Sequence, residues 1–195
     1  IEDGKIFGDN TDGAGLVRDL LAQGIQITGS RVLLLGAGGA SRGVLGPLLE
    51  QSPKELMIAN RSNAKADELV RLFGSLANTL DIALRSVSLS DLEDAGKTTS
   101  PFDLIINATA AGLSDASPIS DVAASNIFTP KSFGYDMVYG KATAFMQQAL
   151  HRGARVSDGL GMLVEQAADA FLIWHGATLA DAIDPRAVLA ELRTS

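Results

Sequence analysis

A glycine-rich turn between an apolar run and a helical pattern constrains this chain more than any other feature. Residues 36–41 read Gly-Ala-Gly-Gly-Ala-Ser and follow 31–35, a short leucine-rich run typical of a buried strand. Helical spacing of apolar residues resumes at Gly39. The first glycine permits a tight turn, the second lets the backbone approach a pyrophosphate, and the first N–H groups of the helix face the anion. The turn therefore either binds a dinucleotide or simply connects a strand to a helix.

The rest of the chain alternates strand and helix patterns around this turn. Period-two or buried apolar runs predict strands at 31–35, 55–59, 82–87, 102–106, 133–138 and 154–156. Helical spacing predicts helices at 12–24, 39–51, 64–73, 143–152, 160–174 and 185–193. Residues 114–130, rich in Ser, Asp, Ala and Pro, are expected to form a linker. The pattern predicts a Rossmann-type α/β fold: a doubly wound, mostly parallel sheet with helices on both faces.

Composition excludes several classes of site. The chain has no Cys, which rules out disulfides, thiolate zinc sites and iron–sulfur clusters, and two His make a histidine-rich metal site improbable. The net charge of −7, with scattered basic residues, argues against a nucleic-acid partner. No uncharged apolar run reaches the roughly 18 residues of a membrane span. We therefore expect a soluble, cytoplasmic protein that uses no metal.

The end of the second predicted strand indicates which dinucleotide the turn would bind. A site for NAD would be expected to carry Asp or Glu there, bonded to the ribose 2′-hydroxyl. This chain has Asn60, Arg61 and Ser62, with Lys65 three positions on. The two cations and the hydroxyl favour a 2′-phosphate, and hence NADP. The alternative is that Ser62 caps the next helix while both cations face solvent.

Three further polar residues are candidates for chemistry. Gln166 shares an apolar stripe with Met162 and Ala170, so its amide needs a partner, either a ligand or a backbone carbonyl. Its neighbours Glu165 and Asp169 are expected to mark the solvent face of that helix. A helical pattern begins at Asp12. Either Thr11 or Asp12 caps this helix, or Asp12 serves as a catalytic carboxylate. Tyr139 follows a predicted strand and either presents its hydroxyl at the sheet edge or packs half-buried.

Six segments, in a fixed order, carry a resemblance to the shikimate dehydrogenase family. They are Gly8-Asp9-Asn10-Thr11-Asp12-Gly13, Gly36-Ala37-Gly38-Gly39-Ala40-Ser41-Arg42, Asn60-Arg61-Ser62, Asn107-Ala108-Thr109, Tyr135-Asp136-Met137-Val138-Tyr139 and Asp158-Gly159-Leu160-Gly161-Met162-Leu163-Val164-Glu165-Gln166-Ala167-Ala168. The whole chain resembles the C-terminal two-thirds of that family. Six ordered segments are far more specific than a glycine turn alone.

The resemblance implies an oxidoreductase that reduces 3-dehydroshikimate to shikimate with NADPH, in the biosynthesis of chorismate and the aromatic amino acids. It implies that Asp12 is the active-site carboxylate and that Asp12, Tyr139 and Gln166 bind the substrate. The cofactor contacts that it implies are Gly36, Ala37, Gly38, Gly39, Ala40, Asn60, Arg61, Ser62, Lys65, Met137 and Gly159. The cofactor would supply the hydride, and the protein would orient the ketone and deliver a proton to its oxygen.

The resemblance also implies a division of the chain. In the family the proton comes from a Lys paired with the Asp, in an N-terminal substrate domain, and no residue here matches that motif. We expect residues 1–12 to be the tail of that domain and 13–158 the NADP-binding domain. Residues 159–195 would be helices that pack on the substrate domain. Their apolar surface is expected to be exposed here or covered by a second copy in a homodimer.

Two alternatives to an NADP-dependent shikimate dehydrogenase stay open. One is a quinate/shikimate dehydrogenase that uses NAD. The other is a nucleotide-binding module without catalysis, which the lack of a matching Lys motif would suit.

Overall fold

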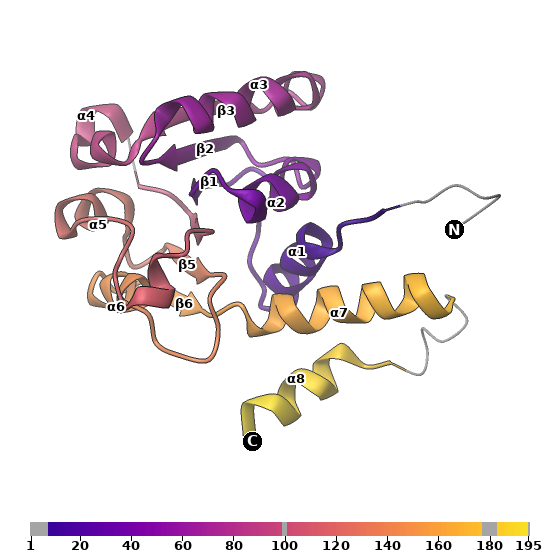
Figure 1. Ribbon diagram of the computed structural model, residues 1–195. Helices are drawn as coiled ribbons and strands as arrows, with labels where there is room; N and C mark the ends of the chain where they lie inside the picture. The colour runs from indigo at the N-terminus through magenta and orange to yellow at the C-terminus, as the bar shows by residue number, and fades with distance from the viewer. Residues whose placement is uncertain (1–7, 99–100, 177–182, 195) are drawn as a thin grey trace.

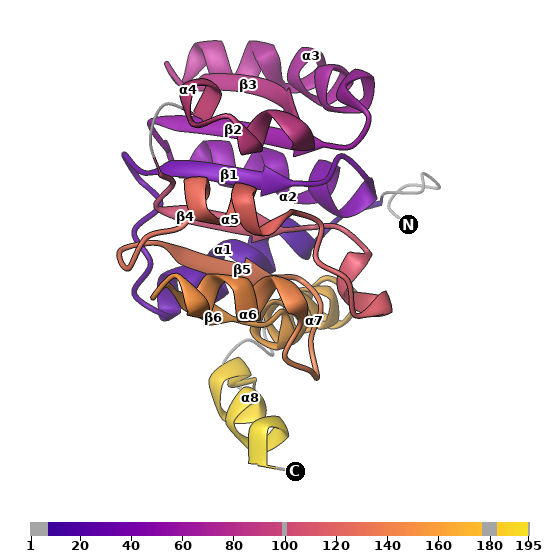
Figure 2. The ribbon, with the colours of Figure 1, turned by 90° about the vertical axis from the view of Figure 1, so that its left-hand side faces the viewer.

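Six parallel strands form a sheet whose spatial order departs from the order of the chain. The computed structural model describes residues 8–98, 101–176 and 183–194. The strands are β1 (Arg31–Leu35), β2 (Glu55–Asn60), β3 (Ala83–Ser88), β4 (Leu104–Asn107), β5 (Phe133–Asp136) and β6 (Arg155–Ser157). They lie in the order β3-β2-β1-β4-β5-β6 (Figure 2), so the topology switches between β1 and β4. The predicted Rossmann-type sheet is confirmed.

Helices cover both faces of this sheet, as Figure 1 shows nearly edge-on. One face carries α1 (Asp12–Ala22), α2 (Gly39–Glu50) and α3 (Asn63–Thr79). The other carries the 3-10 helix η1 (Leu89–Glu93), α4 (Ala95–Thr98), α5 (Asp121–Ile127) and α6 (Ala144–His151). The short η2 (Ala111–Ser114) follows β4, while α7 (Leu160–His175) packs along α1 and α8 (Pro185–Thr194) lies against α7. No helix in the described ranges is long and apolar enough to cross a membrane.

The core lies in two layers, one on each side of the sheet, because successive strand residues point to opposite faces. In β1, Val32 and Leu34 face α1 and α2, whereas Leu33 and Leu35 face α5 and α6. All four side chains are fully buried. Burial on both faces explains why this strand appears in the sequence as a continuous apolar run rather than an alternating one.

Three predicted spans are wrong: the helix predicted at 64–73 continues to Thr79, and each of the other two has a local cause. Residues 114–130 contain α5 instead of a continuous linker: Ser120 caps it by accepting from the Ala123 N–H at 3.2 Å, and Ile127 is buried. The strand predicted at 133–138 ends at Asp136, whose carboxylate accepts the Val138 N–H at 3.0 Å and turns the chain out of the sheet. The first seven residues of the predicted 1–12 segment lie outside the described residues.

The cap of α5 gives a direct test of this local account. Replacing Ser120 by Ala removes the capping acceptor and the exposed bond that its hydroxyl donates to Glu93 Oε1 at 2.8 Å, and it should lower the free energy of unfolding by about 1 kcal/mol. Ser125, inside the same helix, bonds only a carbonyl of its own turn at 2.9 Å, so Ser125→Ala is the matched control. Urea unfolding of both variants checks the difference, and equal losses would contradict the capping role.

Candidate functional site

The carboxyl ends of the parallel strands meet at one edge of the sheet, which is where ligands bind in this architecture. The two middle strands leave that edge side by side: Gly36 follows β1, and β4 ends at Asn107. A Cβ atom added to Gly36 would lie 3.1 Å from the Ala108 carbonyl oxygen, so the two loops are in close contact. The crevice at the topological switch therefore begins at the glycine turn.

The glycine turn has the geometry expected for close approach of a phosphate. Gly36 has φ +108°, a conformation that favours glycine, and its N–H donates to the Ala59 carbonyl at 2.8 Å. Gly38 is the N-cap residue of α2, without a side-chain cap. A Cβ atom added to Gly38 or Gly39 would meet nothing within 4 Å. The backbone is thus open to a ligand at the positive end of α2.

A cleft of about 280 Å³ lies between this turn and α3. Its lining residues are Ala37, Gly38, Gly39, Arg42, Lys65, Glu68 and Leu69. Two cations therefore border it, Arg42 from the first turn of α2 and Lys65 from the first turn of α3. Lys65 was predicted at this site, whereas Arg42 was not assigned a role. Its place three residues after Gly39, on the same helix start, is the signal that could have identified it.

The other predicted cofactor residues after β2, at 60–62, are not among the residues that line this cleft. Arg61 and Ser62 are exposed and do not line the cleft. Ser62 is the N-cap residue of α3, but its hydroxyl makes no capping bond, so the expected cap is absent. Asn60 donates through Nδ2 to the Ser62 carbonyl at 2.9 Å and shapes the turn. Residues 60–62, at the end of β2, include no acidic side chain.

A buried carboxylate shapes the loop after β5, which carries Met137 and Tyr139. Asp136 is fully buried and accepts from Asn107 Nδ2 at 3.1 Å and from Thr143 Oγ1 at 2.6 Å. Together with the Val138 N–H, these donors satisfy a charge that would otherwise be costly to bury. Sequence reasoning assigned Asp136 no role, because a strand-end Asp gives no sign of which donors the fold will bring to it.

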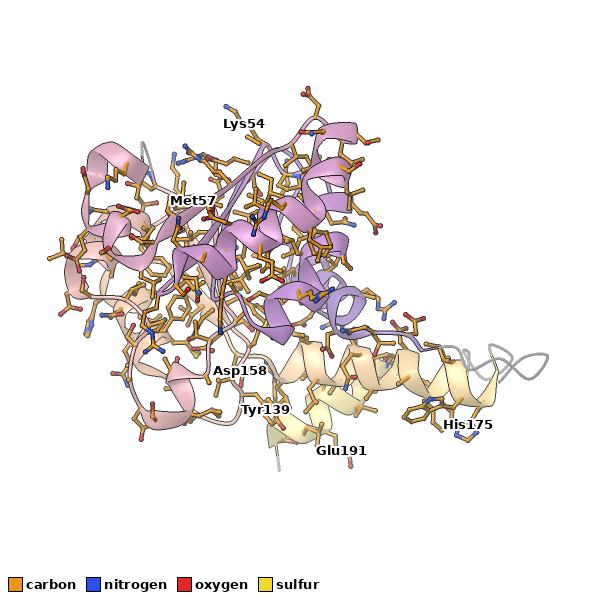
Figure 3. The ribbon with its side chains drawn as sticks, turned by 45° about the horizontal axis from the view of Figure 1, so that its top comes forward. Lys54, Met57, Tyr139, Asp158, His175 and Glu191 are labelled. Carbon is orange, nitrogen blue, oxygen red and sulfur yellow. The ribbon has the colours of Figure 1, made fainter. Side chains whose placement is uncertain are left out.

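The same loop meets the start of α7. Gly159 is packed so closely that an added Cβ atom would lie 2.2 Å from the Met137 carbonyl oxygen. The structure thus brings together two predicted cofactor residues, Met137 and Gly159. Tyr139 is half-exposed, and Figure 3 shows it beside Asp158, at the opposite side of the sheet from Lys54.

A second corner of the site joins the start of α1 to α7. Thr11 donates through Oγ1 to Gln166 Oε1 at 3.3 Å, and Gln166 Nε2 donates to the Leu163 carbonyl at 3.0 Å. The N-cap residue Thr11 makes no side-chain capping bond; Asn10 Oδ1 instead accepts the Asp12 N–H at 2.9 Å. Asp12 and Gln166 therefore lie at one corner, and the Gln166 amide uses both a side chain and a backbone carbonyl.

A glycine lets α1 and α7 approach closely enough to form this corner. A Cβ atom added to Gly15 would lie 2.8 Å from the Gln166 backbone nitrogen and 2.9 Å from the Met162 carbonyl oxygen. Asn10 extends the corner toward the cofactor side, since it lies against Gly43 of α2 and lines a groove of about 530 Å³ with Gly39 and Arg42. Asn10, two residues before Asp12, thus borders the same stretch of α2 as the glycine turn.

The expectation that Glu165 and Asp169 mark the solvent face of α7 is wrong. Glu165 is 7% exposed and faces α1 and α8, where it pairs with Arg18 at 3.2 Å and Arg186 at 2.9 Å. Asp169 pairs with Arg18 as well. Carboxylates at this spacing normally mark solvent, but here two arginines from other helices neutralise them. No cluster of three or more potential metal ligands occurs in the described ranges.

Comparison with known proteins agrees with this geometry. The family described as Shikimate / quinate 5-dehydrogenase matches residues 19–114. A shikimate dehydrogenase (NADP(+)) of Dechloromonas aromatica (strain RCB) is 52% identical over 193 residues, which cover 97% of this chain and 64% of that protein. The chain therefore spans less than two thirds of this relative.

Solved structures share the fold as well. The shikimate 5-dehydrogenase of Thermus thermophilus, in complex with NADP(H) and shikimate, is 32% identical with a TM-score of 0.75, covering 98% of this chain and 65% of that one. The Listeria monocytogenes enzyme, in complex with shikimate and NAD, is 29% identical with a TM-score of 0.77, covering 89% and 60%. In its glycine turn, sheet order and sequence, this chain is similar to shikimate dehydrogenases over nearly its whole length.

Proposed function

We propose that this chain binds NADP(H) and shikimate or 3-dehydroshikimate, and serves the NADPH-dependent reduction of the ketone to shikimate. The observation that carries the proposal is the cleft beside the open glycine turn, bordered by Arg42 and Lys65. Asn10, two residues before Asp12, lines a second groove together with Gly39 and Arg42, and Thr11 bonds Gln166. We place the nicotinamide end of the dinucleotide beside this polar corner, as a hydride transfer requires.

The residues at the cleft fit a dinucleotide with a 2′-phosphate. The open backbone at Gly38 and Gly39 would hold the pyrophosphate, and Met137 and Gly159 would border the nicotinamide side. Lys65 and Arg42 would hold the 2′-phosphate, with Arg61 and Ser62 on its exposed side and Asn60 fixing the turn. Glu68 also lines the cleft, so two cations face one carboxylate and the balance still favours an anion. When bound, the cofactor supplies the hydride.

The substrate side is assigned to Asp12, Tyr139 and Gln166. Gln166 would orient ring hydroxyls through its amide, and Tyr139 would offer its half-exposed hydroxyl from the loop after β5. Asp12 would stabilise the group that delivers a proton to the reacting oxygen. The family pairs this carboxylate with a Lys that no motif of this chain supplies. We therefore propose that this chain binds the substrate and the cofactor, and that turnover requires a Lys paired with Asp12.

The C-terminal helices present an apolar surface that the proposal also accounts for. Phe171, Ile173 and Trp174, near the end of α7, are 39%, 54% and 76% exposed. Apolar surface of this kind is normally covered. We propose that the substrate-binding part present in the longer relatives covers it, so that residues 159–195 join residues 1–12 in that part. A second copy of this chain is the competing cover, and light scattering separates the two.

Cofactor preference follows from the cations at the cleft. Arg42→Met and Lys65→Met each remove a charge-assisted contact and should weaken NADP binding by about tenfold while leaving NAD binding within about twofold. Arg61→Asp should act in the same direction. Arg71→Met is the matched control, because Arg71 is an exposed cation of α3 that does not line the cleft. Calorimetric titration with both dinucleotides measures the four variants.

The same titrations separate the alternatives. Equal losses for NADP and NAD would reject the 2′-phosphate assignment and favour a dehydrogenase that uses NAD. Absence of binding by the unchanged chain would reject the cofactor proposal itself. Binding without any oxidation of shikimate, even with the paired Lys supplied in a longer chain, would favour a module without catalysis.

Substitution of Gln166 tests the proposed substrate corner. Gln166→Ala should weaken shikimate binding in the presence of saturating NADP by about tenfold, because the proposed amide contacts to the ring hydroxyls are lost. Gln147→Ala, an exposed Gln of α6, is the control and should change nothing. Calorimetry with shikimate measures both. Unchanged shikimate affinity in the Gln166 variant would remove this residue from the site.

A further inference from the structure

One buried hydroxyl connects three separate elements of the fold. Tyr135, in β5, is fully buried, and its hydroxyl donates to Asp19 Oδ2 in α1 at 2.8 Å. The same oxygen accepts the Met162 N–H, from the first turn of α7, at 3.3 Å. Tyr135 therefore ties together β5, α1 and α7 at a point that water does not reach.

The partner carboxylate is also fully buried. Besides the tyrosine hydroxyl, Asp19 accepts from Gln23 Nε2 at 2.9 Å and from Arg186 Nη1 of α8 at 3.0 Å. Three donors compensate a charge that would otherwise be strongly unfavourable in the interior. Burial first, and then the charge of Asp19, raise the pKa of Tyr135 well above its ordinary value. The hydroxyl therefore remains a donor at every ordinary pH.

The start of α7 packs directly against Tyr135 and Asp19. A Cβ atom added to Gly161 would lie 2.2 Å from Asp19 Oδ1, so only glycine lets the helix come this close. The positive end of α7 thus faces a buried carboxylate, an arrangement that is favourable for a helix N-terminus. The position of α7 is consequently set by contacts with Asp19 and Tyr135 rather than by apolar packing alone.

The three connected elements lead to the three residues proposed to bind the substrate: Asp12 begins α1, Gln166 lies on α7, and Tyr139 lies in the loop that follows β5. We propose that Tyr135 and Asp19 are positioning residues that hold these three substrate contacts in register without touching the substrate. This inference rests on the proposed function. It adds the requirement that the hydrogen bond between Tyr135 and Asp19 stays intact, although neither residue belongs to the cofactor cleft or to the substrate contacts.

The test removes the hydroxyl and keeps the ring. Tyr135→Phe should weaken shikimate binding to the NADP-saturated chain by about tenfold, the effect of about one lost hydrogen bond, and leave NADP affinity within about threefold. Ser132→Ala is the matched control: its buried hydroxyl, just before β5, donates to the Phe102 carbonyl at 2.7 Å, at the other end of the strand. It should lower the melting temperature as well but leave both affinities unchanged.

A ligand-free readout keeps this inference separate from the proposed function. In nitrogen-15 spectra, Tyr135→Phe should shift the side-chain amide signal of Gln166 and speed amide exchange at Met162, whereas Ser132→Ala should do neither. Asp19→Asn, which keeps an acceptor for the tyrosine, should shift the Gln166 signal less than Asp19→Ala does.

The possible outcomes distinguish failure of the proposed function from failure of the positioning role. If the unchanged chain binds neither ligand, the proposed function fails, and the Gln166 signal alone decides the positioning role. An unmoved Gln166 signal in Tyr135→Phe overturns that role. So does a parallel loss of shikimate and NADP affinity, or a shikimate loss of the same size in Ser132→Ala, because each would indicate general destabilisation.

Discussion

The close crossing of α1 and α7 is the constraint on which the rest of this site depends. It requires a glycine on each helix, Gly15 and Gly161, because an added Cβ atom would collide with the opposing helix. It also requires a buried charge, Asp19, whose donors come from Gln23 just after α1, from β5 and from α8. A charge buried in this way is tolerated only when its geometry is satisfied from several sides, so the crossing leaves little freedom.

The sheet supplies the second half of the arrangement. Parallel strands bring their carboxyl ends to one edge, and the reversal of strand order between β1 and β4 opens a crevice there. The glycine turn, the loop after β5 and the start of α7 all lie at that edge of the sheet. Buried Asp136 performs for the loop after β5 what Asp19 performs for α7: each holds a functional segment through hydrogen bonds to an interior carboxylate.

Much of this could be predicted from local patterns. The strand 31–35 matches β1 residue for residue, and helical spacing located α1, α2 and α7, because period and apolar content are local properties. The helix α5 was missed because its Ser- and Asp-rich start looks like a loop until Ile127 is buried against the sheet. Glu165 was misjudged for the converse reason: two arginines distant in sequence neutralise it.

The sequence by itself determined the class of fold and the glycine turn, since both follow from spacing along the chain and from the absence of a Cβ atom. It also marked Asp12, Gln166 and the cations after β2 as unusual. Only the tertiary structure decided which of these meet, placing Thr11 against Gln166 and Arg42 opposite Lys65. The physical reason is that a hydrogen bond or a buried ion pair depends on positions in space, and here its partners are separated by many residues of chain.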